Sequence, residues 1–223
     1  VGGAGKTMRA YVDSGNTLCG PFVGKVMASA LAMGESNACM KRIVAAPTAG
    51  ACGVLPAVLV NYQKEKGTAD EQIVRALYTA AGIGQVVAAR AYIAGASGGC
   101  QAEIGTASAM AAGALTALGG GTPSQITHAA AMALKNLLGL VCDPVGGLVE
   151  VPCVKRNVIG SVNALSAADM ALAGIISRIP PDQVIDAMRE VGDQMHPSLR
   201  ETGQGGLANT PAAREWCAAQ EEE

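Results

Sequence analysis

The chain has 223 residues, half of them hydrophobic, but only 3 % are aromatic, and its formal net charge is −2. This length is enough for one domain with a substantial core, which small and aliphatic side chains must fill. The charge balance excludes the basic surface of a nucleic-acid-binding protein, and no apolar run is long enough to span a bilayer. We therefore expect neither a nucleic-acid partner nor a membrane segment.

The chain contains seven cysteines, but it shows neither a signal peptide nor the cysteine density of a small secreted domain. An odd number of cysteines in this context argues against a disulfide framework, so we expect a reducing cytoplasm. The chain does not open with methionine, and we expect it to start inside a larger polypeptide.

Taken in chain order, apolar helical stretches alternate with glycine breaks. The opening Gly2-Gly3-Ala4-Gly5-Lys6 imitates the end of a phosphate-binding P-loop but lacks the earlier glycine and the strand of that motif. Strand patterns are scarce, so we predict an all-α fold, a compact bundle of apolar, Ala/Gly-rich helices with Gly/Pro loops around a metal cluster. We place this domain at residues 1–211 and expect residues 212–223 to form a frayed acidic tail. Helices are predicted over residues 22–33, 38–46, 53–64, 69–95, 101–118, 124–141, 154–176 and 181–195.

Three cysteines, Cys100, Cys142 and Cys153, stand at the edges of loops rich in glycine and proline. Cys100 and Cys153 fall next to predicted helix N-termini, where unpaired N–H groups and the helix dipole favour a thiolate. Cys142 closes a predicted helix that Asp143-Pro144 prevents from continuing. The glycines around these cysteines let the backbone approach an inorganic ligand closely. Together these features indicate a cradle for a metal cluster.

Other titratable residues have structural interpretations beside functional ones. Cys52 stands in a tight loop before a predicted helix and is a candidate fourth thiolate. Lys155-Arg156-Asn157 follows Cys153 directly and is a candidate to balance cluster charge or to receive a carboxylate, or simply a solvated helix start. Asp143 and Glu150 flank the cysteine loop, and they and His128 have structural roles by default, with acid–base work as the alternative. Inert thiols are expected at Cys19, Cys39 and Cys217, and His196 lies in a polar turn.

The ordered set of motifs resembles the alpha subunit, or the catalytic C-terminal domain, of the iron–sulfur L-serine dehydratases, also called L-serine ammonia-lyases. No single motif is diagnostic, but their order is specific. The resemblance implies that Cys100, Cys142 and Cys153 hold a [4Fe-4S] cluster. The other motifs that carry the resemblance are Gly2-Gly3-Ala4-Gly5-Lys6, Ala45-Ala46-Pro47-Thr48-Ala49-Gly50-Ala51-Cys52-Gly53-Val54-Leu55-Pro56 and Arg200-Glu201-Thr202-Gly203-Gln204-Gly205-Gly206-Leu207-Ala208.

The resemblance also implies where the substrate binds. It makes the opening glycines an active-site turn, although the family more often has aspartate where Ala4 stands. The chain offers no convincing general base, and the family places a Ser-His-Thr segment in a beta subunit or in a fused N-terminal domain. The candidate substrate-binding residues are Gly2, Gly3, Thr48, Ala49 and Gly50, and the candidate catalytic residue is Lys6.

Three cysteine ligands would leave one iron of a four-iron cluster open to act as a Lewis acid. We therefore expect a lyase that converts L-serine to pyruvate and ammonia, as an oligomer that includes the beta subunit or the fused domain. One alternative is a pyridoxal-phosphate dehydratase, which would need a Schiff-base lysine and a phosphate cup. The others are a cysteine-based metal or redox-sensing module, closed by Cys52, and a structural helical subunit without its own catalysis.

Overall fold

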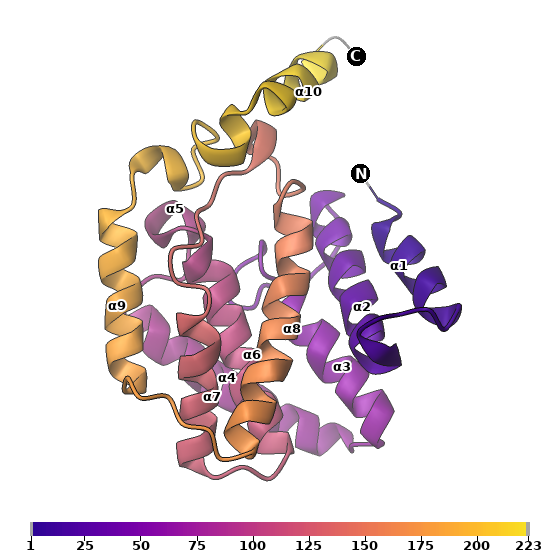
Figure 1. Cartoon of the computed structure of the whole chain (residues 1–223), viewed down its shortest axis with the longest axis vertical. Helices are drawn as coiled ribbons and strands as arrows, with labels where there is room; N and C mark the ends of the chain where they lie inside the picture. Colours follow the sequence, from indigo (N-terminus) through magenta and orange to yellow (C-terminus); the bar gives the residue numbers. More distant parts are fainter. Residues whose placement is uncertain (1, 222–223) are drawn as a thin grey trace.

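Ten α-helices make up most of the described chain (Figure 1). The computed structural model describes residues 2–221, so residue 1 of the predicted domain and residues 222–223 of the predicted tail lie outside the described residues. Within residues 2–221 no β-strand forms, and one isolated parallel bridge joins Cys142 and Arg200. The predicted all-α fold is confirmed. The helices are α1 Ala4–Asp13, α2 Gly20–Ala38, α3 Val54–Lys66, α4 Asp70–Arg90, α5 Gly95–Gly98, α6 Thr106–Leu118, α7 Pro123–Lys135, α8 Cys153–Leu172, α9 Pro181–Gln194 and α10 Pro211–Glu221.

Shorter helical segments stand at the loops. A π-helix, Gln101–Gly105, leads directly into α6, and 3-10 helices form at Val145–Gly147, Pro197–Leu199 and Gly206–Asn209. Single-turn π-helices are rare and often mark functional sites. None of the helices between residues 2 and 221 combines the length and the apolar composition needed to cross a membrane.

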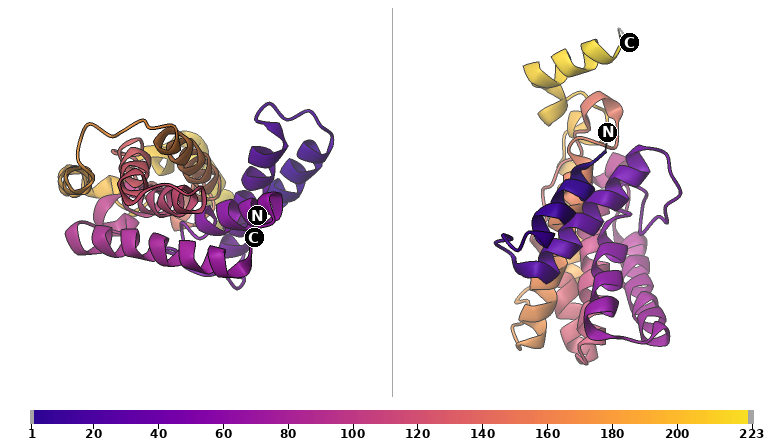
Figure 2. Two further views of the ribbon diagram at one scale, coloured as in Figure 1. Left: turned by 90° about the horizontal axis from the view of Figure 1, so that it is seen from below. Right: turned by 90° about the vertical axis from the view of Figure 1, so that its right-hand side faces the viewer.

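Helix α6 forms the centre of the bundle, and α3, α4, α7 and α8 pack against it (Figures 1 and 2). Every residue from Thr106 to Thr116 is buried, and most are alanine, glycine, serine or threonine. Such small side chains let helices approach closely: a Cβ on Gly160 of α8 would lie 2.9 Å from Cγ2 of Ile104. Ser108 on α6 donates a hydrogen bond to the carbonyl oxygen of Gly160 at 2.8 Å. Close helix packing thus compensates for the scarcity of aromatic side chains in the core.

One predicted helix is absent. Residues 41–47 form no helix, so the prediction for residues 38–46 is wrong. Helix α2 ends at the start of that stretch, and the chain turns through Met40, whose left-handed φ is 55°. Pro47 follows, and a proline disfavours helical backbone at the residue before it.

Other boundaries differ from the predictions: α2 runs on to Ala38 instead of ending at residue 33, α4 ends at Arg90 instead of residue 95, and α8 ends at Leu172 instead of residue 176. Helix α7 ends at Lys135 instead of residue 141, and the chain then turns at Gly139, whose φ is 84°. The predicted frayed tail differs from the structure as well, because residues 211–221 form α10. The hydroxyl oxygen of Thr210 accepts a hydrogen bond from the N–H of Ala213 at 3.3 Å, which is a typical N-cap.

Helix α1 was not predicted; it lies at the edge of the molecule, packed on α2 (Figures 1 and 2). Two of its first N–H groups, from Ala4 and Gly5, donate to the Glu35 carboxylate of α2 at 2.6 and 3.3 Å. Gly5 also brings the helices together, since a Cβ there would lie 2.9 Å from the backbone N and Cα of Ala32. Helix α1 therefore depends on contacts with α2 that no local sequence pattern reveals.

Substituting alanine for two helical glycines should separate the effect of helix packing on stability from the effect of helix propensity. Gly5→Ala should lower the free energy of unfolding by about 1–3 kcal/mol, because its methyl group meets backbone that cannot move aside. Gly82→Ala on α4 meets nothing within 4 Å, and should raise the same free energy by about 0.5–1 kcal/mol through helix propensity alone. Urea denaturation of both variants measures these changes; equal effects would show that α1 does not pack as described.

Candidate metal centre

The three predicted cysteines lie at one end of the bundle, each on a different segment. Cys100 immediately precedes the π-helix, Cys153 is the first residue of α8, and both helix starts are as predicted. Cys142 lies in an extended segment, not at a helix end: its N–H donates to Leu199 O at 2.8 Å, and its carbonyl accepts from the N–H of Glu201 at 2.7 Å. All three cysteines are buried, and all seven cysteines of the chain are free thiols.

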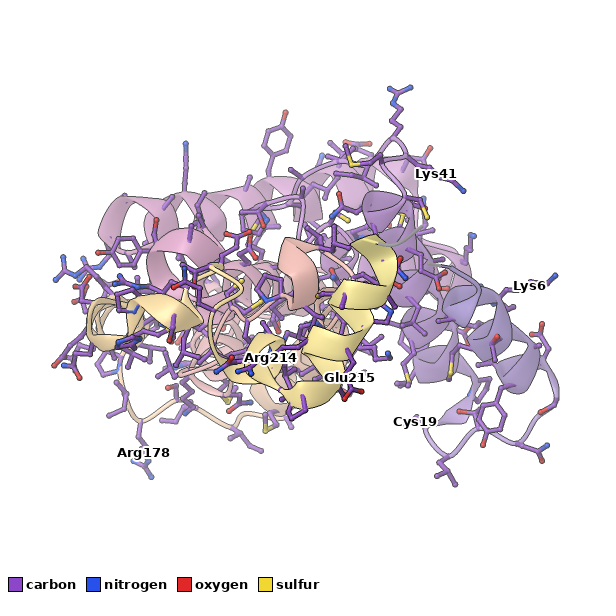
Figure 3. All side chains as sticks on the ribbon, turned by 90° about the horizontal axis from the view of Figure 1, so that it is seen from above. Lys6, Cys19, Lys41, Arg178, Arg214 and Glu215 are labelled. Atoms are coloured by element: carbon purple, nitrogen blue, oxygen red, sulfur yellow. The ribbon has the colours of Figure 1, made fainter. Side chains whose placement is uncertain are left out.

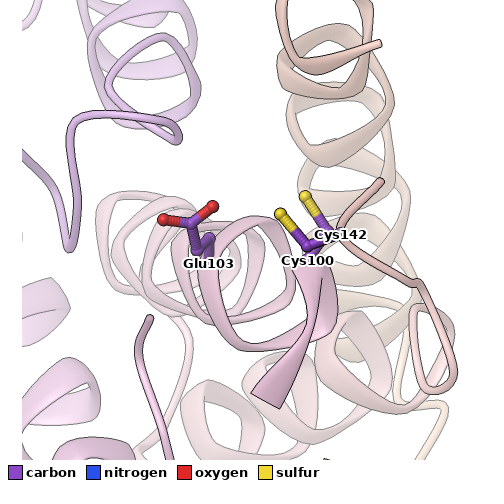
Figure 4. A group of neighbouring side chains, drawn as sticks. All are labelled: Cys100, Glu103 and Cys142. Carbon is purple, nitrogen blue, oxygen red and sulfur yellow. The ribbon is translucent and has the colours of Figure 1, made fainter. Parts of the chain in front are cut away.

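The closest group of possible metal ligands is Cys100, Glu103 and Cys142 (Figure 4). One ligand atom from each, the two sulfurs and a carboxylate oxygen, lies within 4.8 Å of the others. Figure 4 shows the carboxylate and both sulfurs directed to the same side of the π-helix. Cys153 is not a member of this tight group. It lies close enough for the charge of Cys100 to act on it.

The electrostatics favour one thiolate among the three sulfurs. A hydrogen bond from the Cys142 thiol lowers the pKa of Cys100 against the effect of burial, and the nearby Arg156 guanidinium lowers it further. The same hydrogen bond, together with burial, raises the pKa of Cys142. Burial, with the charge of Cys100 adding to it, raises the pKa of Cys153 to about 12. The protein alone thus stabilises a thiolate at Cys100 and neutral thiols at its neighbours.

Arg156, on the first turn of α8, is the buried cation of the site. It donates to Asp143 Oδ1 at 2.8 Å and to the carbonyl oxygen of Val141 at 2.7 Å. The second oxygen of Asp143 accepts from the N–H of Leu207 at 2.7 Å. Burial would lower the pKa of Arg156, but the charges of Cys100 and Asp143 outweigh it and raise that pKa. Arg156 therefore joins α8, the Cys142 segment and the 200–208 segment into one unit.

Asn157, the next residue on α8, holds the loop that precedes α3. It is 1 % exposed, accepts from the N–H of Gly53 at 2.9 Å, and donates to the carbonyl oxygens of Gly50 and Cys153 at 2.8 and 3.0 Å. These three hydrogen bonds, the Asn157 clasp, hold the 48–50 loop beside the thiols. From there the Thr48 hydroxyl donates to Glu103 Oε1 at 2.8 Å.

The structure brings some of the predicted substrate-binding residues to this site. Thr48 and Gly50 adjoin Glu103, since a Cβ on Gly50 would lie 3.0 Å from Glu103 Oε2, and Ala49 lies exposed between them. Gly2 and Gly3 are exposed and precede α1. Figure 3 shows the side chain of Lys6 pointing out from the edge of the molecule, and the residue is exposed.

Other candidates lie apart from the closest ligand group. Cys52 is buried, its thiol faces the carbonyl oxygen of Met33 at 3.7 Å, and desolvation raises its pKa to about 11. His196 is exposed and bonds Ser198 through Nδ1 at 2.8 Å. His128 has a buried Nδ1 without a hydrogen-bond partner among residues 2–221.

Sequence reasoning missed Glu103 and Glu201. Glu103 stands three residues after Cys100, a spacing that puts both side chains on one face of a helix, and this signal was available. Glu201 carries no such signal: it reaches the site because its N–H pairs with Cys142. Its charge raises the pKa of both Glu103 and Cys142, after the larger effects of burial and hydrogen bonding.

Breaking the Arg156–Asp143 pair should destabilise the whole chain. Asp143→Ala should lower the free energy of unfolding by about 3–5 kcal/mol, because it leaves a buried guanidinium and the N–H of Leu207 without their acceptor. Glu71→Ala, which removes the exposed Arg75–Glu71 pair on α4, should change it little. Chemical denaturation measures both variants. A small effect of Asp143→Ala would show that Arg156 finds another partner.

Comparison with known proteins gives the family of the chain. The family model described as serine dehydratase alpha chain matches residues 1–208. The "Probable L-serine dehydratase, alpha chain" of Bacillus subtilis is 56 % identical over 96 % of this chain and 72 % of its own length. The "L-serine dehydratase, alpha chain" of Peptoniphilus asaccharolyticus is 50 % identical over 94 % and 72 %, and an L-serine dehydratase of Escherichia coli is 48 % identical over 80 % and 40 %. The chain belongs to the serine dehydratase alpha chain family.

Proposed function

We propose that this chain is the alpha chain of an L-serine dehydratase, which converts L-serine to pyruvate and ammonia, and that Cys100, Cys142 and Cys153 hold its [4Fe-4S] cluster. The observation that carries the proposal is the meeting of three buried cysteines from separate segments, next to one buried arginine. The family and the names of its relatives support the reaction. They do not specify the cofactor.

The residues present fit such a cluster. A four-iron cluster takes each thiolate on a different iron, so its cysteines need not meet as closely as the ligands of one ion. Room beside the sulfurs depends on Gly95, where a Cβ would lie 2.9 Å from Cys142 Sγ and 3.1 Å from a Glu103 oxygen. Arg156 supplies positive charge where thiolates must form.

With three cysteine ligands, a bound cluster supplies one open iron as a Lewis acid toward the substrate hydroxyl. The chain's own residues then hold and orient L-serine. The amides of the 48–50 loop are proposed to receive the substrate carboxylate, and the Asn157 clasp keeps that loop in place. Loss of the α-proton and of the β-hydroxide, which together make one water, converts L-serine to aminoacrylate, which tautomerises and hydrolyses to pyruvate and ammonia. No redox change is required.

Single replacements of the three cysteines test the ligand set. Cys100→Ser, Cys142→Ser and Cys153→Ser should each lose most of the iron and sulfide that the anaerobically prepared chain retains, because each removes one anchor of the cluster. Cys39→Ser and Cys217→Ser serve as controls and should keep the wild-type content. Full retention of iron in one of the first three variants would remove that cysteine from the set.

A second candidate function rests on the tight Cys100, Glu103 and Cys142 group, whose spacing suits a single metal ion. In that case the chain would be a metal- or redox-sensing module, or a structural subunit without catalysis. Iron and sulfide analysis separates the two proposals. About four irons and four sulfides per chain support the cluster, whereas one metal without sulfide supports the single ion.

We also propose that a beta subunit or fused N-terminal domain supplies the general base. Two relatives are named as alpha chains, and this chain spans only 40 % of the E. coli relative, which leaves room there for such a domain. The exposed opening at residues 2–6 and the 48–50 loop are the proposed docking surface. Lys6 is the proposed catalytic contribution of this chain to the combined site. A reducing cytoplasm would suit the free thiols.

Reconstitution with the partner tests this division of labour. The iron-loaded chain alone should release little pyruvate from L-serine, and addition of the beta subunit should restore turnover, because the base comes from the partner. Lys6→Ala should depress turnover about 100-fold or more without changing the iron content, if Lys6 acts in proton transfer. Lys41→Ala, an exposed lysine outside the proposed surface, is the matched control. Full activity of the chain alone would place the base within it.

A further inference from the structure

Glu103 is a half-buried carboxylate without an ion-pair partner among residues 2–221. Its hydrogen bonds come from neutral donors, the Thr48 hydroxyl at 2.8 Å and the backbone N–H of Gly95. Among residues 2–221, none of the ion pairs includes Glu103. The charged and ionisable groups that act on it or lie beside it are acidic: Cys100, Cys142 and Glu201. Arg156, the buried cation of the site, donates its hydrogen bonds to Asp143 and Val141.

Burying such a carboxylate costs free energy unless a positive charge lies beside it. The two neutral donors orient the group without neutralising it, and burial accordingly raises the pKa of Glu103. Within residues 2–221 the fold therefore holds an oriented carboxylate with no countercharge paired to it. Glu103 is half-buried, so the residue is not sealed from solvent.

We propose that Glu103 binds the α-ammonium group of the substrate amino acid, and that Thr48 is the positioning residue that aims its carboxylate. The inference rests on the proposed L-serine dehydratase function and extends it to the recognition of the amino group. L-serine carries its ammonium and its hydroxyl on adjacent carbons. An ammonium held at Glu103 therefore keeps the hydroxyl near the sulfurs of Cys100 and Cys142, which lie within 4.8 Å of the carboxylate.

The proposal assigns a specificity to the site. A carboxylate that needs a cation should favour amino acids over hydroxy acids of the same size, since the latter leave Glu103 uncompensated. The 48–50 loop would bind the substrate carboxylate, and Glu103 would bind its ammonium group. The hydrogen bond from the Thr48 hydroxyl to Glu103 connects these two parts of the site. One short loop and the π-helix would thus recognise both charged groups of the substrate.

The test compares two ligands that differ in one group. L-serine and 3-hydroxypropionate share the carboxylate and the hydroxyl, but only L-serine has the ammonium. Their dissociation constants are measured anaerobically by titration calorimetry, under conditions too brief for turnover or without the partner, on the iron-loaded wild type, Glu103→Gln, Glu103→Asp and Glu201→Gln. Iron and sulfide are determined on the same samples.

Glu103→Gln should weaken L-serine binding about tenfold to hundredfold, the usual worth of a hydrogen bond to a charged group, and leave 3-hydroxypropionate unaffected. Glu103→Asp should keep part of the preference because it keeps the charge. Thr48→Val should lower the preference in the same direction but by less. Glu201→Gln is the control for a general loss of negative charge near the thiols and should leave the preference unchanged.

Several results would overturn the assignment. Loss of iron in Glu103→Gln would make Glu103 a metal ligand, and equal weakening of both ligands would make it structural. An unchanged preference, or the same change in Glu201→Gln, would show that no specific ammonium contact exists. Failure of the proposed function looks different: the wild type with its partner would then produce no pyruvate from L-serine, whatever residue stands at position 103.

Discussion

The candidate site depends on the buried contact between Arg156 and Asp143. One guanidinium spans the first turn of α8, the carbonyl of Val141 and the carboxylate of Asp143, and the other carboxylate oxygen binds Leu207. The pair thus joins the start of α8 to the 141–143 segment, and through Asp143 to Leu207, which lies 64 positions away in sequence. A buried pair adds little net stability by itself, but it is costly to break, so it fixes one arrangement of the cysteines among the many that the loops allow.

The sequence was sufficient for the fold class and for the placement of Cys100 and Cys153 at helix starts, because both are local signals. Glycines and prolines interrupt the apolar stretches, and such interruptions can be read one at a time. The position of Thr48 against Glu103 could not be read, because the two residues are 55 positions apart and meet only after Asn157 has fixed the loop. Helix α1 was missed for the same reason, since its contacts come from α2.

The division between helices and loops explains where the site is. Helices α6 and α8 approach closely through small residues. The cysteines, Glu103 and Arg156 gather at the end of the bundle at which the π-helix and α8 begin (Figure 1). There the loops carry the donors and Cys142, while the helix starts carry Cys100, Cys153 and Arg156. Rigid helices of this kind hold the groups on their ends more accurately than loops can.

The charges at that end are unbalanced in a way that favours a cationic ligand. Arg156 acts on Cys100 and Cys153, while Glu103 and Glu201 add negative charge near the thiols. The hydrogen bond with Cys100, together with burial, raises the pKa of Cys142, and burial together with the charge of Cys100 raises the pKa of Cys153, so ionisation of both thiols is opposed. A metal bound through Cys142 and Cys153 would release their protons, so its affinity should rise with pH. Because of this imbalance, a cation that binds the folded site should stabilise it. Loading of the cofactor should therefore raise the stability of this end of the bundle.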